Sequence, residues 1–176
     1  MAHKKLRFED DVKGGLSYMD SPEKIEDRIN GSFHLFRDLV IIAAGDESNP
    51  EARNTFFEEA GKILGTAREI CDLESTEDDF SYVPSYLKVN KEFHDPLFAA
   101  VRAYSPGVED PKLRKIYGQL MDNWMFVTAK YNTYRMDMST IDTGSSLDII
   151  AEGIDLHKQG RDREFFEKHQ ALLPPE

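Results

Sequence analysis

Asn90 and His94 are the two residues of this sequence whose types and spacing best fit a binding site. They lie four positions apart, so on a helix both side chains project from one strip of its surface. An apolar stripe with a period of three to four residues runs beside them, through Tyr86, Val89, Phe93, Leu97, Val101 and Tyr104. A polar pair at the margin of such a stripe can reach into a helical bundle. We therefore expect residues 86–104 to form the element around which the chain is organised.

Three histidines on predicted amphipathic helices, His34, His94 and His169, are candidate metal ligands. Imidazoles from different helices can meet inside a bundle and bind a metal ion with a further ligand. A packed and hydrogen-bonded histidine is the commoner outcome at such positions, so both interpretations stay open. His157 lies near a predicted helix end, where a positively charged ring is favoured by the helix dipole. The single cysteine, Cys71, fits no cysteine-based zinc pattern and is expected to be a buried, inert thiol.

Composition excludes several classes of function. The 176 residues suit one domain, and 40% hydrophobic with 31% charged residues is ordinary for a globular protein. The formal net charge of −11 opposes binding to a phosphate backbone, so we expect no direct nucleic-acid contact. The best apolar run, residues 39–44, is far shorter than the roughly 20 residues of a membrane span. The single cysteine and the absence of a signal-peptide core favour a cytoplasmic protein. No glycine-rich phosphate loop and no serine nucleophile elbow is present.

Helical signals recur along almost the whole chain. Serine or asparagine followed by proline and an acid opens segments at residues 21 and 49, and Asp110-Pro111 opens a third. The expected helices cover residues 21–45, 50–73, 84–104, 111–134, 147–160 and 162–172, with a bend at Pro96 just after His94. We predict an all-α fold, an antiparallel bundle of about six helices over residues 21–176, preceded by an extended arm at 1–20.

The fourth of these helices carries the most regular stripe of the sequence. Large apolar residues alternate at spacings of four and three, at Leu113, Tyr117, Leu120, Trp124, Val127, Tyr131 and Tyr134. A stripe of this length is typical of a bundle core or of a dimer face. Its aromatic rings could also line a ligand cavity, although packing is the more common use.

Three short blocks resemble the FadR C-terminal (FCD) domain, the ligand-sensing half of GntR-type transcription regulators. The resemblance spans Phe36 to His169. The first block is Phe36-Arg-Asp-Leu39 with Ile42-Ala-Ala44, similar to the family's first helix with its arginine and alanine pair. The second, Asn90-Lys-Glu-Phe-His94-Asp-Pro-Leu97, is similar to the family's D-x-x-F-H-x-x-L. In the third, Ile154 precedes His169 by the family's spacing of 15 residues.

The resemblance implies a partly altered metal site. Family members that bind metal use an aspartate, a histidine four residues on, a glutamate-histidine pair and a closing histidine. These fall on Asn90, His94, Ser146-Leu147 and His169. Leucine cannot bind a metal and asparagine brings no charge, so the resemblance leaves open a site without metal or one divalent ion held by His94, His169 and Asn90. Too few residues precede Phe36 for the family's helix-turn-helix, so the implied part is the sensor alone.

The function expected from the resemblance is a ligand-sensing domain, and no enzyme. A small carboxylate would lie inside the bundle of a homodimeric, cytoplasmic protein, contacted by Asn90, His94, His169 and Arg37. For Arg37 a salt bridge with Asp38 is an equally good interpretation. Two alternatives remain. One is a small helical metalloenzyme that uses His34, His94 and His169 with a carboxylate of the acidic loop at 74–79. The other is a helical interaction module without a ligand.

Overall fold

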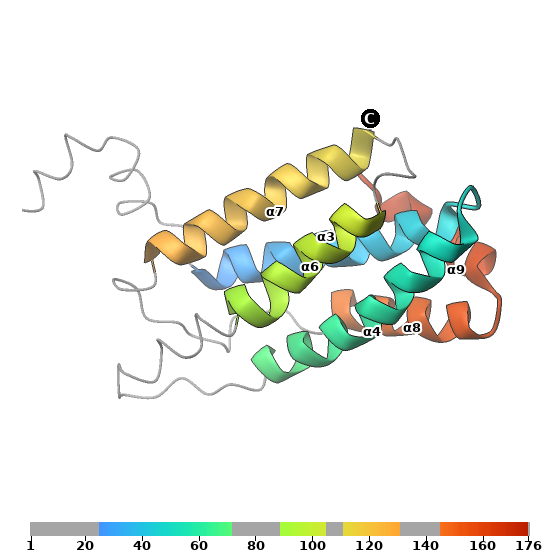
Figure 1. The fold of residues 1–176 in the computed structure, drawn as a ribbon, viewed down its shortest axis with the longest axis horizontal. Coiled ribbons are helices and arrows are strands. Elements are labelled where there is room, and N and C mark those ends of the chain that lie inside the picture. The colour runs from blue at the N-terminus through green and yellow to red at the C-terminus, as the bar shows by residue number, and fades with distance from the viewer. Residues whose placement is uncertain (1–24, 72–88, 105–110, 131–144, 176) are drawn as a thin grey trace, which may run out of the picture.

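The structure is a computed structural model that describes residues 25–71, 89–104, 111–130 and 145–175 (Figure 1). The predicted all-α bundle of about six helices is confirmed, and no strand occurs within these ranges. The α-helices are α3 (Ile25–Gly45), α4 (Pro50–Cys71), α6 (Asp95–Tyr104), α7 (Pro111–Lys130), α8 (Ser145–Lys158) and α9 (Asp162–His169). A π-helix, η2 (Val89–His94), precedes α6, and a 3₁₀ turn, η5 (Gln170–Leu172), follows α9. No helix in these ranges is long and apolar enough to span a bilayer. The predicted arm at 1–20 lies outside the described residues.

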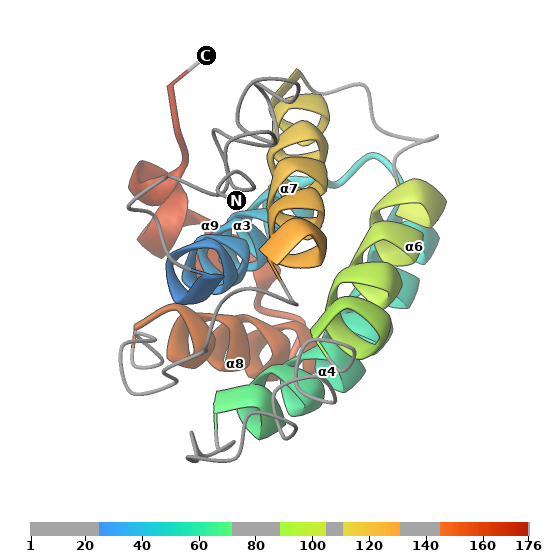
Figure 2. The same cartoon turned by 90° about the vertical axis from the view of Figure 1, so that its left-hand side faces the viewer.

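The central element of the bundle is α3, and the expectation that residues 86–104 take this place is wrong. Helices α4, α7, α8 and α9 all pack against α3. In Figure 2, α3 is seen almost end-on, with α7, α8 and α9 close around it. Six consecutive residues, 39–44, are all buried, as is required of a helix with neighbours on every side. The short apolar run that cannot span a membrane therefore serves as the core of the bundle.

The predicted start and stop signals account for the helix ends that the structure describes. α3 ends at Gly45, and the Asn49 side chain caps α4 by accepting a hydrogen bond from the Ala52 amide at 3.0 Å. α8 ends before Gly160, whose φ of 72° is the left-handed conformation that glycine adopts most easily. The Arg161 amide then donates back to the Leu156 carbonyl at 2.8 Å, which closes the helix end. These local signals fix where α8 turns into α9.

The core is apolar and dense around the start of α6. The Phe93 ring meets Phe33 and Phe36 edge-on, with centroids 5.2 and 6.1 Å apart, and all three rings are fully buried. On α7 the predicted stripe is only partly buried. Leu113, Leu120 and Val127 are buried, Tyr117 and Trp124 are half-buried, and the remaining tyrosines of the stripe lie outside the described residues. Cys71, expected to be buried, is half-buried at the last residue of α4.

Candidate functional site

His94 ends the π-helical segment η2, which leads directly into α6. Pro96 gives a physical reason for the segment. A proline has no amide hydrogen, and its ring crowds the carbonyl oxygen four residues earlier, so regular α-helical bonds cannot continue through this point. At the predicted bend the structure therefore has a π-helical turn, a feature that often marks functional sites. The turn keeps the predicted pair together, with 2.9 Å between His94 Nδ1 and Asn90 Oδ1.

Six side chains from α3, η2 and α7 form one hydrogen-bond chain through His94, here called the polar chain. In order they are Arg28, Asn123, Ser32, His94, Asn90 and Thr128, joined at 3.2, 3.0, 2.8, 2.9 and 2.9 Å. The Thr128 hydroxyl in turn donates to the backbone carbonyl of Trp124 at 2.9 Å. The polar chain therefore ties together three elements that are far apart in the sequence.

The direction of these hydrogen bonds is fixed from the Thr128 end. Because the Thr128 proton goes to a backbone carbonyl, Thr128 accepts from the Asn90 amide nitrogen. Asn90 then turns its carbonyl oxygen to His94, which must donate from Nδ1. The neutral ring accepts at Nε2 from the Ser32 hydroxyl, and Ser32 accepts from Asn123. Both ring nitrogens are thus satisfied in one tautomer, which carries its proton on Nδ1.

Burial keeps the His94 ring neutral. The residue has 0% exposure, and burial lowers its pKa from 6.5 to about 3. A charged imidazolium would lose its hydration here, and its direct partners are an uncharged amide and a hydroxyl. Near neutral pH the ring is therefore a hydrogen-bonding group and carries no charge.

An open pocket of about 360 Å³ lies at the Arg28 end of the polar chain. This α3–α7 pocket is lined by Arg28, Gly31, Leu35, Gln119, Asp122 and Asn123. The Arg28 guanidinium lies 4.6 Å from the centroid of the Phe126 ring, which favours its charge. Since Arg28 and Asn123 are both pocket wall and the first members of the polar chain, hydrogen bonds lead without a break from the pocket to His94.

His169 does not join His94 in a common site, contrary to expectation. Its Nε2 lies 3.0 Å from Glu152, and its ring packs against Phe165. Burial opposes ionisation of Glu152, but hydrogen bonds from Lys168 and His169 lower its pKa overall. Figure 1 shows α9 toward the opposite end of the bundle from the start of α6. The predicted convergence of the two rings on one interior cavity is therefore wrong.

Arg37 is engaged by its neighbour in the sequence. Two of its guanidinium nitrogens donate to Asp38 at 3.1 and 3.0 Å, as in the salt-bridge interpretation. Burial raises the pKa of Asp38, against the lowering effect of Arg37 and His34. The pair lies on α3 but has no hydrogen bond to the polar chain among the described residues, so Arg37 is not part of this site.

The described residues do not assemble the predicted metal sites. No group of three or more His, Cys, Asp or Glu side chains in these ranges is arranged to hold a metal ion, which argues against the set His34, His94 and His169. His34 is hydrogen-bonded to the hydroxyl of Ser146, and Leu147 is buried in the core. Both nitrogens of His94 are occupied within the polar chain, so Asn90, His94 and His169 do not form a coordination site either. The acidic loop at 74–79 lies outside the described residues.

Four members of the site, Arg28, Ser32, Asn123 and Thr128, were missed by sequence reasoning. Ser32 and Asn123 are buried, with 0% and 7% exposure, although both are polar. A signal existed on α3, where Arg28 and Ser32 are spaced four apart beside an apolar stripe, as Asn90 and His94 are. Nothing comparable marks Asn123, because its partners lie more than 90 positions away.

A second polar group, here called the charged cluster, lies where α8 turns into α9. His157 Nδ1 is 2.7 Å from Asp162, and Arg53 approaches the same carboxylate at 3.8 Å. The His157 ring also stacks on Phe57, with centroids 4.1 Å apart. Nearby, Tyr104 donates to Asp46 at 2.6 Å, beside a smaller pocket of about 250 Å³ between α4 and α6. Burial would raise the pKa of Asp46, but bonds from Ser48 and Tyr104 lower it overall.

No family model, no curated protein and no solved structure matches this chain. The site is therefore interpreted from its own geometry, together with the short motifs that resemble the FCD domain.

Proposed function

We propose that this chain is a ligand-sensing regulatory domain that binds a small organic acid in the α3–α7 pocket. The observation that carries the proposal is the unbroken polar chain from the pocket wall to the buried His94. The described bundle interior is packed with apolar side chains. We therefore place the ligand in the α3–α7 pocket and not in the interior. Resemblance to the sensor half of GntR-type regulators supports the same class of function.

Arg28 is the group proposed to hold the acid. A guanidinium offers several N–H donors in one plane, which match a carboxylate, and charge-assisted bonds of this kind are stronger than neutral ones. The carboxamide of Asn123 lies beside it at 3.2 Å and can add a further hydrogen bond. A volume of about 360 Å³ is within the range typical of small-molecule sites.

The polar chain supplies a route by which occupancy changes the protein. An acid on Arg28 competes for the donor that Arg28 now gives to Asn123, and Asn123 holds Ser32. Ser32, in turn, is the hydroxyl partner of His94 on η2. Binding therefore shifts the balance between two arrangements of α3, η2 and α7, provided that the acid prefers one of them.

The regulatory setting is part of the same proposal. By resemblance, the domain works as a homodimer in the cytoplasm and controls a DNA reader. The formal net charge of −11 fits a chain that does not grip nucleic acid. Light scattering of the purified protein would test the dimer separately from ligand binding.

The binding step is tested by thermal unfolding with acetate, propionate, succinate and amino-substituted acids at fixed pH and ionic strength. A ligand that binds the folded state raises the midpoint, and the rise continues with the logarithm of the ligand concentration above Kd. We expect at least one acid to do so, and Arg28→Met to remove the effect while keeping an apolar stem over Phe126. Arg114→Met is the matched control, since Arg114 is an exposed arginine of α7 outside the pocket. The proposal fails if no acid acts, or if the effect survives in Arg28→Met.

The same experiment separates the two other classes of function. If no acid stabilises the protein, the helical interaction module becomes the better interpretation. Turnover that depends on an added metal would favour the metalloenzyme. The arrangement of His34, His94 and His169 among the described residues gives that alternative no support.

A further inference from the structure

The α3–α7 pocket holds charges of both signs. Arg28 contributes a cation and Asp122 an anion, and both line the same space of about 360 Å³. Asp122 is exposed and has no hydrogen-bond or ion-pair partner among the residues that the structure describes. An anion left facing a pocket is a ready partner for a ligand cation. A simple acid would use only the Arg28 side of this pair.

The two helices order these groups along the pocket. α3 and α7 run antiparallel in Figure 1, and Arg28 and Leu35 are seven residues apart on α3, about 10 Å along the axis. On α7, Asn123 lies beside Arg28, and Gln119 is one turn further toward Leu35. The pocket thus has a polar end with both charges and a second end formed by an apolar side chain and an amide.

Gly31 keeps the space between these ends open. A Cβ atom added at Gly31 would lie 3.6 Å from the Asn123 amide nitrogen, an ordinary contact distance, so nothing in the packing requires glycine here. Glycine in a helix interior costs about 1 kcal/mol relative to alanine. Because glycine has no side chain, the pocket stays open at Gly31, which we call its floor.

We propose that the natural ligand of the α3–α7 pocket is a zwitterion, an α-amino acid with an uncharged side chain. Its carboxylate lies against Arg28, its ammonium group against Asp122, and its side chain points toward Leu35 and Gln119. This inference rests on the proposed function and narrows the class of acid. The formal net charge of −11 supports it, because an acidic surface repels a simple anion but has no such effect on a ligand without net charge.

Isothermal titration calorimetry with the purified chain tests this, using standard L-amino acids with uncharged side chains one at a time. For each amino acid that binds, two analogues are compared. One lacks the amine, as 4-methylpentanoate does relative to leucine, and the other lacks the carboxylate, as 3-methylbutylamine does. We expect each analogue to bind at least about tenfold more weakly, since each makes only one of the two charged contacts that the amino acid makes.

Variants assign the two charges. Asp122→Asn should weaken binding of the amino acid about tenfold, because the ammonium contact is lost, and should not weaken binding of the deaminated acid. Asp148→Asn, at an exposed aspartate of α8 outside the pocket, is the matched control and should change neither. Gly31→Leu, which fills the floor, should abolish binding of both ligands without loss of helix content.

The outcomes separate this inference from the proposed function. If simple carboxylates bind as tightly as amino acids, and Asp122→Asn has no effect, the sensor proposal stands and the zwitterion is wrong. If neither amino acids nor simple acids bind, both proposals fall. Tighter binding of amino acids that persists in Asp122→Asn also overturns the assignment of the ammonium contact.

Discussion

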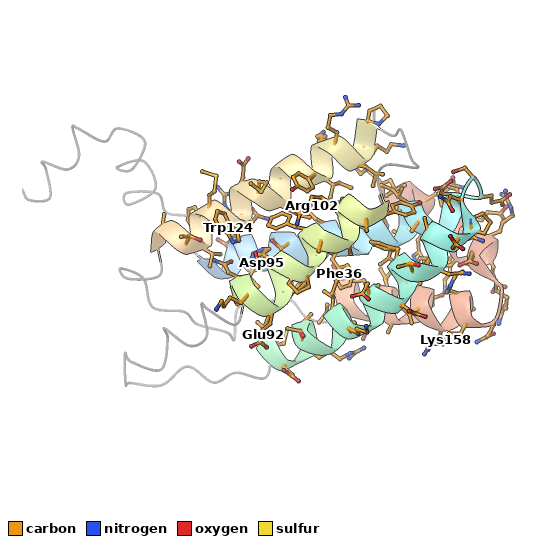
Figure 3. The ribbon with its side chains drawn as sticks, in the orientation of Figure 1. Phe36, Glu92, Asp95, Arg102, Trp124 and Lys158 are labelled. Carbon is orange, nitrogen blue, oxygen red and sulfur yellow. The ribbon has the colours of Figure 1, made fainter. Side chains whose placement is uncertain are left out.

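His94 and His157 occupy opposite kinds of surroundings in the same bundle. Figure 3 labels the residue after each, Asp95 and Lys158, and places them toward opposite ends of the molecule. His94 is fully buried and bonded to an amide and a hydroxyl. The side chain of His157 keeps 15% of its exposure, and its partner is the carboxylate of Asp162.

The difference follows from the cost of burying charge. Removing an ionised group from water is expensive unless strong partners replace the lost hydration, whereas neutral amides and hydroxyls need only one hydrogen bond for each polar atom. The polar chain meets this condition inside the bundle with uncharged links around His94. In the charged cluster Asp162 is also buried, with 8% exposure, but its charge is balanced by Arg53 and it lies beside a partly exposed His157. We therefore expect the stability of the polar chain, here the inner region, to depend on hydrogen-bond geometry. The stability of the charged cluster, the outer region, should also depend on salt concentration.

Replacing each histidine by alanine should give the largest contrast. His94→Ala leaves a cavity and removes a partner from both Ser32 and Asn90, so we expect a loss of about 3–5 kcal/mol in the free energy of unfolding. His157→Ala should cost less, about 1–2 kcal/mol, because Asp162 keeps its interaction with Arg53. Urea unfolding followed by circular dichroism measures both. Equal losses would show that the two sites do not differ in the way their burial indicates.

The pH dependence of stability is expected to come from His94 in the inner region. Its pKa in the folded state, about 3, lies below the 6.5 of an exposed histidine, so the unfolded chain binds more protons between these values. Stability is therefore fully present above pH 6.5 and is lost as the pH falls toward 3. The slope approaches about 1.4 kcal/mol per pH unit once the unfolded histidine is charged, and the loss between pH 6.5 and 4.5 is about 2 kcal/mol.

The variant His94→Gln isolates this effect, because it keeps a neutral polar side chain but cannot titrate. Carboxylates such as Glu152 and Asp46 contribute equally to both proteins and cancel in the difference. The wild-type curve should fall more steeply than that of the variant below pH 6.5. Parallel curves would mean that water or a nearby anion stabilises the charged ring.

The effect of salt on the free energy of unfolding should also differ between the charged cluster and the polar chain. Asp162→Asn weakens the interactions with Arg53 and His157, and because Asp162 is buried we expect a loss of about 1–3 kcal/mol at low ionic strength that shrinks only in part in about 1 M salt. Ser32→Ala is the matched variant of the polar chain, where the loss comes from unpaired neutral groups and should not depend on salt. Unfolding free energies of both variants at two salt concentrations provide the measurement. A salt-dependent loss in Ser32→Ala would contradict the uncharged character of the inner links.

The same contrast explains which features could be predicted from the sequence. Helix ends are set by neighbours in the chain, so Asn49, Gly45 and Gly160 could be interpreted correctly. The Asn90–His94 pair was also local and is confirmed at 2.9 Å. An apolar stripe, however, does not tell which other helix it will face. The period of the stripe does not show where the last helix packs. For this reason His169 was wrongly assigned to the site of His94.

The partners of the polar chain were hidden for a related reason. Ser32 and Asn123 are ordinary polar residues whose burial is decided by contacts between α3 and α7, 91 positions apart in sequence. No local rule distinguishes a buried serine in a helix from an exposed one. The central place of α3 was missed as well, because the apolar run at 39–44 does not tell how many other helices will pack around it.

The smallest expected effect on stability, and the sharpest test of the inner region, is Asn90→Asp. The new carboxylate still accepts from His94 Nδ1 but loses the amide donor to Thr128, so we expect a cost of about 1 kcal/mol at pH 7. It also places an anion beside the ring, which should raise the pKa of His94 by about 1–3 units. Asn49→Asp adds the same charge at a helix start remote from the ring, and should leave that pKa unchanged. An NMR titration of the imidazole measures both. An unchanged pKa in Asn90→Asp would mean that the side chain at position 90 does not lie against the His94 ring, and the Asn90–His94 link of the polar chain would then be wrong.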